Sequence, residues 1–299
     1  MAVVGLGRIG SVVAACLRAA DAHKVLVCAR RVHARLVLEL PAGDVVDVSL
    51  DVKTDPAEVP VVDWVLLCTK AHETASTAPW LARLCGPATQ VAVLQNGIAH
   101  VQRVASFIGP ATVVPTIVYY NGERLAEDRV RLRHATASDL AVKDDAGGRA
   151  FAQLFEGTPL HVLVSPAFTT LAWRKLLLNV AANPITALTL QRQIVLRRAD
   201  VRKLCLALFE EAVAVARAEG ADLDEEEAGR ALETLMSYPA EAGTSMYFDR
   251  LAGRPLEADA LTGPIVEAGE LHKIPTPLNS ALLTLLRAIS DASNASVRP

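Results

Sequence analysis

The sequence lacks several features that mark whole classes of protein. Its 299 residues include five cysteines, an odd number without a Cys-x-x-Cys pair, so we expect reduced thiols rather than disulfides or a zinc site. The seven histidines form no His-x-x-x-His or paired pattern, and we predict no metal site. No apolar run reaches about 18 residues, which argues against a membrane-spanning helix. These absences favour a cytoplasmic protein without a membrane partner.

A large excess of positive or negative charge is missing as well. Thirty Lys and Arg stand against 33 Asp and Glu, for a net charge of -3, and without a basic run we expect no nucleic-acid partner. The chain enters an apolar strand and a glycine loop at once, so we expect no signal peptide. The full sequence is 52% hydrophobic and 21% charged, enough for one large core or two ordinary ones.

The N-terminal stretch carries the clearest local motif. An apolar strand over 1–4 is predicted to lead into Gly-Leu-Gly-Arg-Ile-Gly, with a helix over 11–20 and a strand over 24–29 behind it. In this context, glycines at the three motif positions are typical of dinucleotide binding, with the phosphates at the helix N-terminus. The alternative is a glycine turn without a ligand. The predicted cofactor-binding residues of this loop are Gly5, Leu6, Gly7, Arg8, Ile9 and Gly10.

The end of the second strand bears on which nicotinamide cofactor binds. An NAD site usually has Asp or Glu there, to bond the ribose 2′-hydroxyl, whereas this chain has Arg30-Arg31. A guanidinium suits a 2′-phosphate, so we predict NADP(H), with Arg30 as the better candidate for the contact. The alternative is a pair of exposed surface arginines.

Polar turns follow two later strands. Lys70 comes after an apolar strand over 61–68, and Asn96-Gly97 closes a strand over 90–94. Open α/β sheets bind ligands at the carboxyl ends of their strands, so Lys70 and Asn96 are candidates for the cofactor site. The alternative for each is ordinary loop chemistry, since Asn-Gly is a common turn.

Strands and helices alternate through the rest of the first half. The further strands predicted there are 44–52, 112–120, 129–134, 138–142 and 160–164, and the helices are 72–85, 99–107 and 149–155. The Asn121-Gly122 dipeptide suggests that 112–120 and 129–134 pair antiparallel through a long connection. We therefore predict an α/β fold with an N-terminal Rossmann-type doubly wound sheet over 1–165, followed by an all-α domain over 166–299.

The second half is organised around the apolar segment AWRKLLLNVAANPITAL over 172–188. Lys175, Asn179 and Asn183 recur every four residues in it, so they lie in one stripe of a largely buried helix. Asn lowers helix propensity, which favours a polar site over a solvated face. Pro184 is expected to bend or break this helix and leave Asn183 near its end.

Further helices are predicted to the end of the chain. They cover 200–220, a segment opened by an acidic cap over 222–225, 258–271, and 278–289 before a polar tail. Taken alone, Ser245 is best interpreted as a helix N-cap, and Glu257 as a carboxylate at a helix dipole.

These separated positions together resemble the ketopantoate reductase (2-dehydropantoate 2-reductase) family, over nearly the whole chain. The segment WRKLLLNVAANPITAL looks like that family's catalytic helix, and Ser245-Met246-x-x-Asp249 and Glu257 match two further motifs. The glycine loop, Arg30, Lys70 and Asn96-Gly97 match its cofactor motifs. Gln95 and Thr244 depart from the usual His and Ser, which leaves the substrate open.

The resemblance implies an NADPH-dependent oxidoreductase of pantothenate biosynthesis. It implies hydride transfer to the C2 ketone of a small 2-oxo acid in a cleft between the domains, with Lys175 as general acid and Glu257 orienting it. Burial and a cationic neighbour can draw a lysine pKa toward working pH. The implied substrate-binding residues are Asn179, Asn183, Ser245 and Asn96, and Lys70, Asn96 and Glu257 join the cofactor-binding set.

Other functions stay open at this point. One is a reductase of a different small 2-oxo acid, and another is a β-hydroxyacid dehydrogenase. That class also has a helical lysine with an asparagine four residues on, but carries Ser-Gly-Gly where this chain has Gln95-Asn96-Gly97. A third is a protein that senses NADPH without chemistry. The apolar C-terminal helices are compatible with a monomer or a homodimer.

Overall fold

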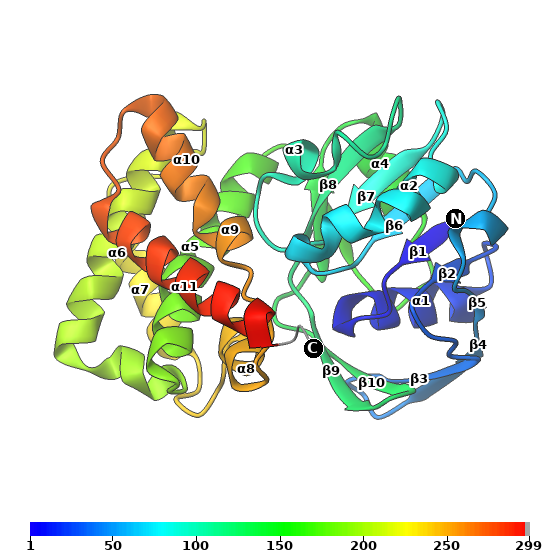
Figure 1. Cartoon of the computed structure of the whole chain (residues 1–299), viewed down its shortest axis with the longest axis horizontal. Coiled ribbons are helices and arrows are strands. Elements are labelled where there is room, and N and C mark those ends of the chain that lie inside the picture. Colours follow the sequence, from blue (N-terminus) through cyan, green and yellow to red (C-terminus); the bar gives the residue numbers. More distant parts are fainter. Residues whose placement is uncertain (297–299) are drawn as a thin grey trace. The chain divides into compact units, whose positions relative to one another are not determined.

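The computed structural model describes residues 1–296, with side chains described to Ala292. The chain divides into two compact units, Met1–Phe168 and a second that begins at Thr169. Figure 1 shows that the first contains the β-sheets and the second consists of helices. Within the described residues, no helix combines the length and apolar character needed to cross a membrane.

One sheet of eight strands forms the centre of the first unit. The strands are β1 Ala2–Val4, β2 Leu26–Cys28, β5 Asp51–Lys53, β6 Trp64–Leu67, β7 Gln90–Val93, β8 Thr112–Val118, β11 Leu140–Lys143 and β12 Val162–Ser165. Their order is β12-β11-β8-β7-β6-β1-β2-β5, and every neighbouring pair is parallel except β8 with β11. The outward winding from β1 confirms the predicted doubly wound sheet.

The central strands bury both of their faces. Ala2 and Val4 pack in a core with α2 Ala78–Leu84 and α3 His100–Val104, whereas Val3 packs in a second core with helices on the other face. Those helices are α1 Arg8–Ala20 and α4 Ala146–Gln153. Side chains of a strand alternate between faces, so this burial follows directly from an apolar strand between two helical layers.

A second, four-stranded sheet covers the outer side of α1 (Figure 1). Its strands are β3 Arg35–Glu39, β4 Val45–Ser49, β9 Asn121–Ala126 and β10 Arg129–Arg133, in the order β4-β3-β10-β9. The sequence pattern did not predict β3 or β9. Short 3-10 turns, η1 Pro56–Glu58 and η2 Ala71–Thr77, complete the first unit, and η2 replaces the start of the helix expected over 72–85.

Two predictions about the strands were wrong, one about the extent of a strand and one about a pairing. The strand expected over 44–52 is divided between β4 in the second sheet and β5 at the edge of the central sheet. The expected antiparallel pairing of 112–120 with 129–134 does not form, because β10 pairs with β9 while β8 pairs with β7 and β11. An alternating pattern indicates which residues share a face but does not identify the partner strand.

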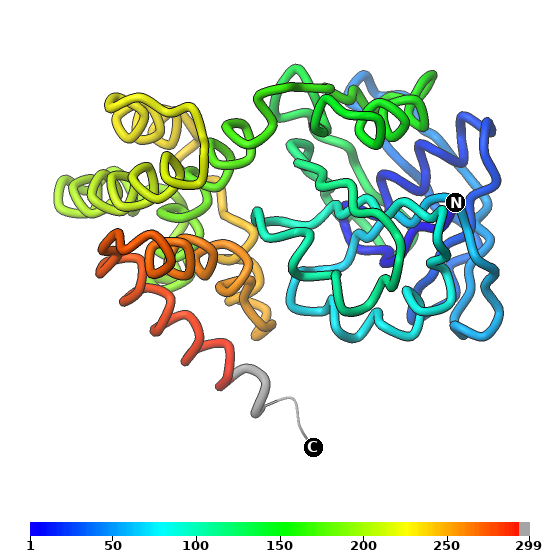
Figure 2. Tube along the Cα trace, turned by 90° about the horizontal axis from the view of Figure 1, so that it is seen from above, coloured from blue at the N-terminus to red at the C-terminus, as the bar shows by residue number. Residues whose placement is uncertain are grey.

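The second unit is all-helical, as predicted. Its elements are α5 Phe168–Thr189, η3 Gln193–Arg197, α6 Ala199–Ala218, α7 Glu227–Ser237, α8 Ser245–Leu251, α9 Ala258–Leu261, α10 Gly263–His272 and α11 Pro277–Ser296. Figure 2 shows α11, in red, beside α9 and α10, in orange. The carboxylate of Glu211 accepts hydrogen bonds from the backbone N–H groups of Leu278 and Asn279, which fixes the start of α11 on α6.

Three expected helix boundaries were wrong. The helix expected over 258–271 is interrupted at Thr262, between α9 and α10. The acidic run over 222–225 precedes α7 rather than starting it, although Asp224 Oδ1 still accepts a hydrogen bond from the Glu226 N–H at 2.9 Å. The polar tail expected after 289 is helical as far as Ser296, and 297–299 lie outside the described residues.

Pro184 does not break α5, which continues to Thr189. The Thr186 hydroxyl donates to the carbonyl of Ala182 at 2.7 Å, so a polar group near the proline still finds a partner. Ile185 and Ala187 are enclosed in the core of the unit. Burial of this last turn offsets the cost of an interior proline, about 3 kcal/mol, so Asn183 lies inside the helix rather than at its end.

Candidate active site

The glycine loop leaves the carboxyl end of β1 and leads directly into α1. Gly5 has φ +97°, and a Cβ there would lie 2.7 Å from Thr69 Cγ2. A Cβ on Gly10 would lie 1.9 Å from the Gly5 carbonyl oxygen, so the helix packs this closely only on glycine. The nearest atom to a Cβ on Gly7 would be the Cys68 carbonyl oxygen, at 3.9 Å. The fold itself requires Gly5 and Gly10, whereas the space beside Gly7 remains open for a ligand.

The N-terminus of α1 is suited to an anion. Its N-cap is Gly7, which has no side chain to bond the first N–H groups, and the first turn contains no acidic residue. The free N–H groups and the helix dipole both favour negative charge at this point. The donors present therefore fit the diphosphate of a dinucleotide.

The other predicted cofactor residues lie at the same edge of the sheet. Val4 is in register with Cys28 and Leu67, and Leu67 with Val93, so four parallel strands end at one level. The loops that leave these ends carry the predicted cofactor-binding residues, namely Gly5 to Gly10, Arg30, Lys70 and Asn96. The structure thus brings together, within the first unit, residues from four separate parts of the sequence.

Arg30 is on the surface at the end of β2. Its side chain is 89% exposed and donates to Glu73 Oε1 at 3.0 Å. Arg31 is also exposed, 3.9 Å from a Glu127 carboxylate oxygen. Exposed ion pairs of this kind contribute about 1 kcal/mol or less. A doubly charged 2′-phosphate can therefore replace the Glu73 carboxylate at the Arg30 guanidinium.

A buried amide links the loops after β6 and β7. Gln95 is 4% exposed, and its Nε2 donates to the hydroxyls of Thr69 at 3.1 Å and Thr74 at 3.0 Å. Arg103 of α3 donates to Gln95 Oε1 at 3.2 Å and to the Asn96 carbonyl at 3.1 Å. Sequence reasoning identified Gln95 only as a departure from the family pattern. Its partners show that it fixes the turns on which two predicted cofactor residues lie.

In the second unit, the polar stripe of α5 contacts α8. Asn183 is 3% exposed, and its Nδ2 donates to Asn179 Oδ1 at 3.0 Å. Asn183 Oδ1 accepts from Ser245 Oγ and from the Met246 N–H, each at 3.3 Å. Asn179, Asn183 and Ser245 therefore form one chain of hydrogen bonds. Asn183 is buried and Asn179 is partly exposed, and each amide has a hydrogen-bond partner, which offsets the cost of placing asparagine in a helix.

The N-cap of α8 is Thr244 rather than Ser245. The Thr244 hydroxyl accepts from the Tyr247 N–H at 3.1 Å and lies 2.7 Å from the Thr186 hydroxyl. Interpreting Ser245 as an N-cap was therefore wrong. Because Thr244 supplies the cap, the exposed Ser245 side chain is available for another role.

The amine of Lys175 has a perturbed pKa. Burial lowers the pKa of Lys175 from 10.5 to about 8, while the charge of Glu257 acts in the opposite direction. Glu257 is itself 4% exposed, at the N-cap position of α9. A buried ammonium within electrostatic reach of a buried carboxylate is an arrangement suited to proton transfer near neutral pH.

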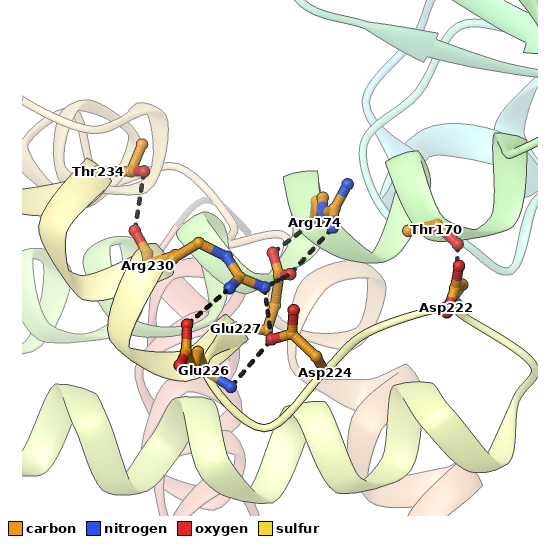
Figure 3. Close-up of polar contacts among 8 residues, drawn as sticks. All are labelled: Thr170, Arg174, Asp222, Asp224, Glu226, Glu227, Arg230 and Thr234. Carbon is orange, nitrogen blue, oxygen red and sulfur yellow. Dashed lines mark hydrogen bonds and ion pairs between the residues drawn. The ribbon is translucent and has the colours of Figure 1, made fainter.

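The neighbouring cation of Lys175 is compensated by a carboxylate. Figure 3 shows Arg174 directed at Glu227 of α7, with two hydrogen bonds of 2.9 and 3.1 Å. Arg230 donates to the same carboxylate at 2.7 Å and to Asp224 at 2.6 Å. The expectation that burial lowers the pKa of Lys175 is confirmed, whereas the part that gave a cationic neighbour the same effect was wrong, since burial alone lowers this pKa.

The part of the chain that the structure describes contains no set of side chains arranged to bind a metal ion. No group of three or more His, Cys, Asp or Glu is placed there to hold a metal ion. The five cysteines are free thiols, and four of them are buried.

Comparisons with known proteins cover both units. Residues 1–144 match the family model described as Ketopantoate reductase PanE/ApbA, and residues 167–290 match Ketopantoate reductase PanE/ApbA C terminal. A Mycobacterium tuberculosis (strain CDC 1551 / Oshkosh) protein named 2-dehydropantoate 2-reductase is 40% identical over 292 residues, which are 97% of this chain and 98% of the relative. A Caulobacter vibrioides protein of the same name is 37% identical, over 96% and 98% of the two chains.

A solved structure is similar over the same extent. The dimeric ketopantoate reductase from Staphylococcus aureus superposes with a TM-score of 0.86 at 26% sequence identity, covering 98% of this chain and 99% of that one. The similarity therefore includes the sheet unit and the helical unit alike.

Proposed function

This chain belongs to the ketopantoate reductase family, and from that premise we propose that it reduces 2-dehydropantoate (ketopantoate) to pantoate with NADPH. The observation that carries the proposal is the lowered pKa of Lys175. Burial lowers this pKa to about 8, and the Glu257 carboxylate is close enough to act on the amine electrostatically. On the same helix, Asn179 and Asn183 continue the polar stripe toward Ser245. An acid with polar groups beside it fits the reduction of a small keto acid.

The first unit supplies the cofactor site in this proposal. The open space at Gly7 and the uncapped N-terminus of α1 fit the diphosphate, and Arg30 fits the 2′-phosphate that distinguishes NADPH from NADH. When bound, NADPH supplies the hydride. Lys70 and Asn96 align the nicotinamide ribose and the substrate from the ends of β6 and β7.

The second unit supplies the proton. As the ketone is reduced, negative charge develops on its oxygen, and the Lys175 ammonium donates a proton to that oxygen. A pKa of about 8 keeps most of the amine protonated at neutral pH while making it a better acid than an ordinary lysine. Glu257 orients the ammonium and offsets part of the cost of burying its charge.

The amides and the hydroxyl hold the substrate. Asn183 fixes Asn179 and Ser245 in one hydrogen-bonded chain, so the three side chains present donors and acceptors in a defined order. We assign Ser245 and Asn183 to the substrate carboxylate or hydroxyl, and Asn179 to the hydroxyl end. Ordered polar groups reduce the entropy lost when a small substrate is positioned.

A substrate panel tests the proposal. Initial rates of NADPH loss are measured against ketopantoate, other 2-oxo acids and, in the oxidative direction, 3-hydroxy acids, and the series is repeated with NADH. The expected result is the highest kcat/KM with ketopantoate and NADPH. Turnover confined to another 2-oxo acid or to 3-hydroxy acids, faster oxidation of NADH, or tight NADPH binding without turnover would each replace the proposal with a different function.

For the oligomeric state we propose a monomer or a homodimer. The S. aureus relative is described as dimeric, which supports the second of these.

A further inference from the structure

The edge strand β9 of the second sheet, together with the residue before it, contacts the glycine loop and the start of α1. Just before β9, the Tyr120 hydroxyl donates to the carbonyl of Ile9 at 2.9 Å. Gly122 lies so close to the loop that a Cβ there would be 2.3 Å from the Arg8 carbonyl oxygen. The backbone that precedes and begins α1 is therefore held by a strand more than 100 residues later in the chain.

Arg124, two residues further along β9, reaches the loop with its side chain. Its Nη2 donates to the Leu6 carbonyl at 2.6 Å and to the Ser11 hydroxyl at 3.0 Å, and its Nη1 donates to the Glu127 carbonyl at 2.8 Å. All three acceptors belong to neutral groups. Among the residues that the structure describes, no carboxylate forms an ion pair with Arg124.

The charge of this guanidinium is only partly compensated, by Glu127, without an ion pair among the described residues. Burial lowers the pKa of Arg124, and the positive charge of Arg8 lowers it further, with Glu127 acting in the opposite direction. Two guanidinium groups that repel each other beside the positive end of a helix raise the energy of the cofactor-free protein. An anion bound at this helix N-terminus relieves that repulsion, so the arrangement favours a polyanionic ligand.

We propose that Arg124 is a positioning residue of the cofactor loop, which fixes the Leu6 carbonyl and adds its charge to that of Arg8 where the diphosphate binds. The inference rests on the proposed function to the extent that this loop binds a nicotinamide dinucleotide. Because Arg124 holds the Leu6 carbonyl oxygen, the peptide group that contains this carbonyl cannot rotate so that the oxygen faces the ligand. The diphosphate is common to NADPH and NADH, so Arg124 acts on both cofactors, whereas Arg30 acts on the 2′-phosphate of one.

Nucleotide binding to the full chain tests this inference. Dissociation constants of NADPH and NADH are measured for the wild type, R124Q, which removes the charge, and R124K, which retains it. The matched control is R133Q, on β10 of the same sheet, where an exposed arginine pairs with Glu123. The expected result is a rise of about tenfold or more in both dissociation constants for R124Q, a smaller rise for R124K, and no change for R133Q.

Two further measurements separate positioning from a general loss of structure. In R124Q, kcat at saturating NADPH is expected to stay within about twofold of the wild type, and the salt dependence of binding to weaken for both nucleotides. Hydrogen exchange of the cofactor-free protein is expected to accelerate at the amides of residues 7–11 but not in β6 or β7. If R124Q does not fold, the dissociation constants and amide exchange of R124K decide the matter in the same way.

Specific outcomes overturn the inference. Unchanged dissociation constants in R124Q, or in R124K when R124Q does not fold, would show that Arg124 does not position the loop. A rise for NADPH alone would make it a 2′-phosphate contact instead. If the wild type binds neither nucleotide, the proposed function fails and the inference with it, whereas normal wild-type binding with unaffected variants removes the inference alone.

Discussion

The two units of this chain place their polar groups in opposite ways. At the sheet edge of the first unit, Arg30 is 89% exposed and the backbone at Gly7 is open. On α5 and its neighbours, Asn183 and Glu257 are almost completely buried, and burial lowers the pKa of Lys175 to about 8. Binding a nucleotide requires reachable backbone and charge, whereas donating a proton requires an amine whose pKa its surroundings have shifted.

The largest effect is expected from removing the acid of the second unit. K175A should lower kcat for ketopantoate by about 10²–10⁴, because the proposed proton donor is lost while the amides proposed to bind the substrate remain. Steady-state kinetics at saturating NADPH measure this. K203A, which removes an exposed lysine of α6, is the control and should retain full activity. An unaltered kcat in K175A would remove Lys175 from the mechanism.

The next largest effect concerns the exposed arginine of the first unit. R30A should raise the KM for NADPH about 10- to 100-fold, the loss expected for a charge-assisted hydrogen bond, and leave the KM for NADH and both kcat values nearly unchanged. Kinetics with the two cofactors provide the comparison, and R31A is the neighbouring control. Equal effects on NADPH and NADH would show that Arg30 does not recognise the 2′-phosphate.

Two glycines of one loop separate a residue that the fold requires from one that leaves space for a ligand. G10A should lower the free energy of unfolding by about 1–3 kcal/mol, because its Cβ would lie 1.9 Å from the Gly5 oxygen. G7A should leave stability nearly unchanged and weaken NADPH binding. Urea unfolding and a binding titration measure the two effects. G229A, in α7 with open space around it, is the control; similar stability losses in G7A and G10A would contradict the distinction.

The smallest effect is a gain in stability that follows from the buried amine. The folded-state pKa of Lys175, about 8, is below its unfolded value of 10.5, so the unfolded chain holds the proton more tightly between these values. The cost of the buried charge is fully present below pH 8 and disappears as pH rises toward 10.5. K175M should therefore stabilise the cofactor-free protein at pH 7 by about 1–2 kcal/mol, a value reduced for solvent screening because Lys175 as a whole residue is partly exposed.

Urea unfolding at pH 7 and above pH 10 measures this gain. The difference between K175M and the wild type should be largest at pH 7 and vanish at the higher pH. K203M, at an exposed position, should change stability by no more than about 0.5 kcal/mol. A destabilised K175M at pH 7 would mean that the contacts of the ammonium outweigh the cost of its burial.

Local periodicity explains why parts of the fold, and the candidate residues of the site, could be predicted. A glycine loop between a strand and a helix is a continuous motif, and Lys175, Asn179 and Asn183 share a stripe through helix geometry alone. Both signals lie within about twenty residues of sequence. The doubly wound sheet and the helical second half followed from the same kind of pattern.

Contacts between distant segments explain the failures. The strand β9 has a weak burial pattern, because only Gly122 in it is fully enclosed, and its pairing with β10 was missed. The partners of Gln95 include Thr69, 26 residues away, and Arg124 contacts Leu6 across 118 residues. Pro184 stayed inside its helix because tertiary burial outweighed a local preference. None of these contacts can be predicted from the spacing of residues within a single segment of the sequence.

The pH dependence of kcat for ketopantoate reduction at saturating NADPH tests the central claim most directly, that a lysine with a pKa lowered by burial donates the proton. The account predicts a kcat that is constant below pH 8 and falls about tenfold per pH unit above it, as the Lys175 amine loses its proton. A kcat that stays constant to pH 10 would contradict it.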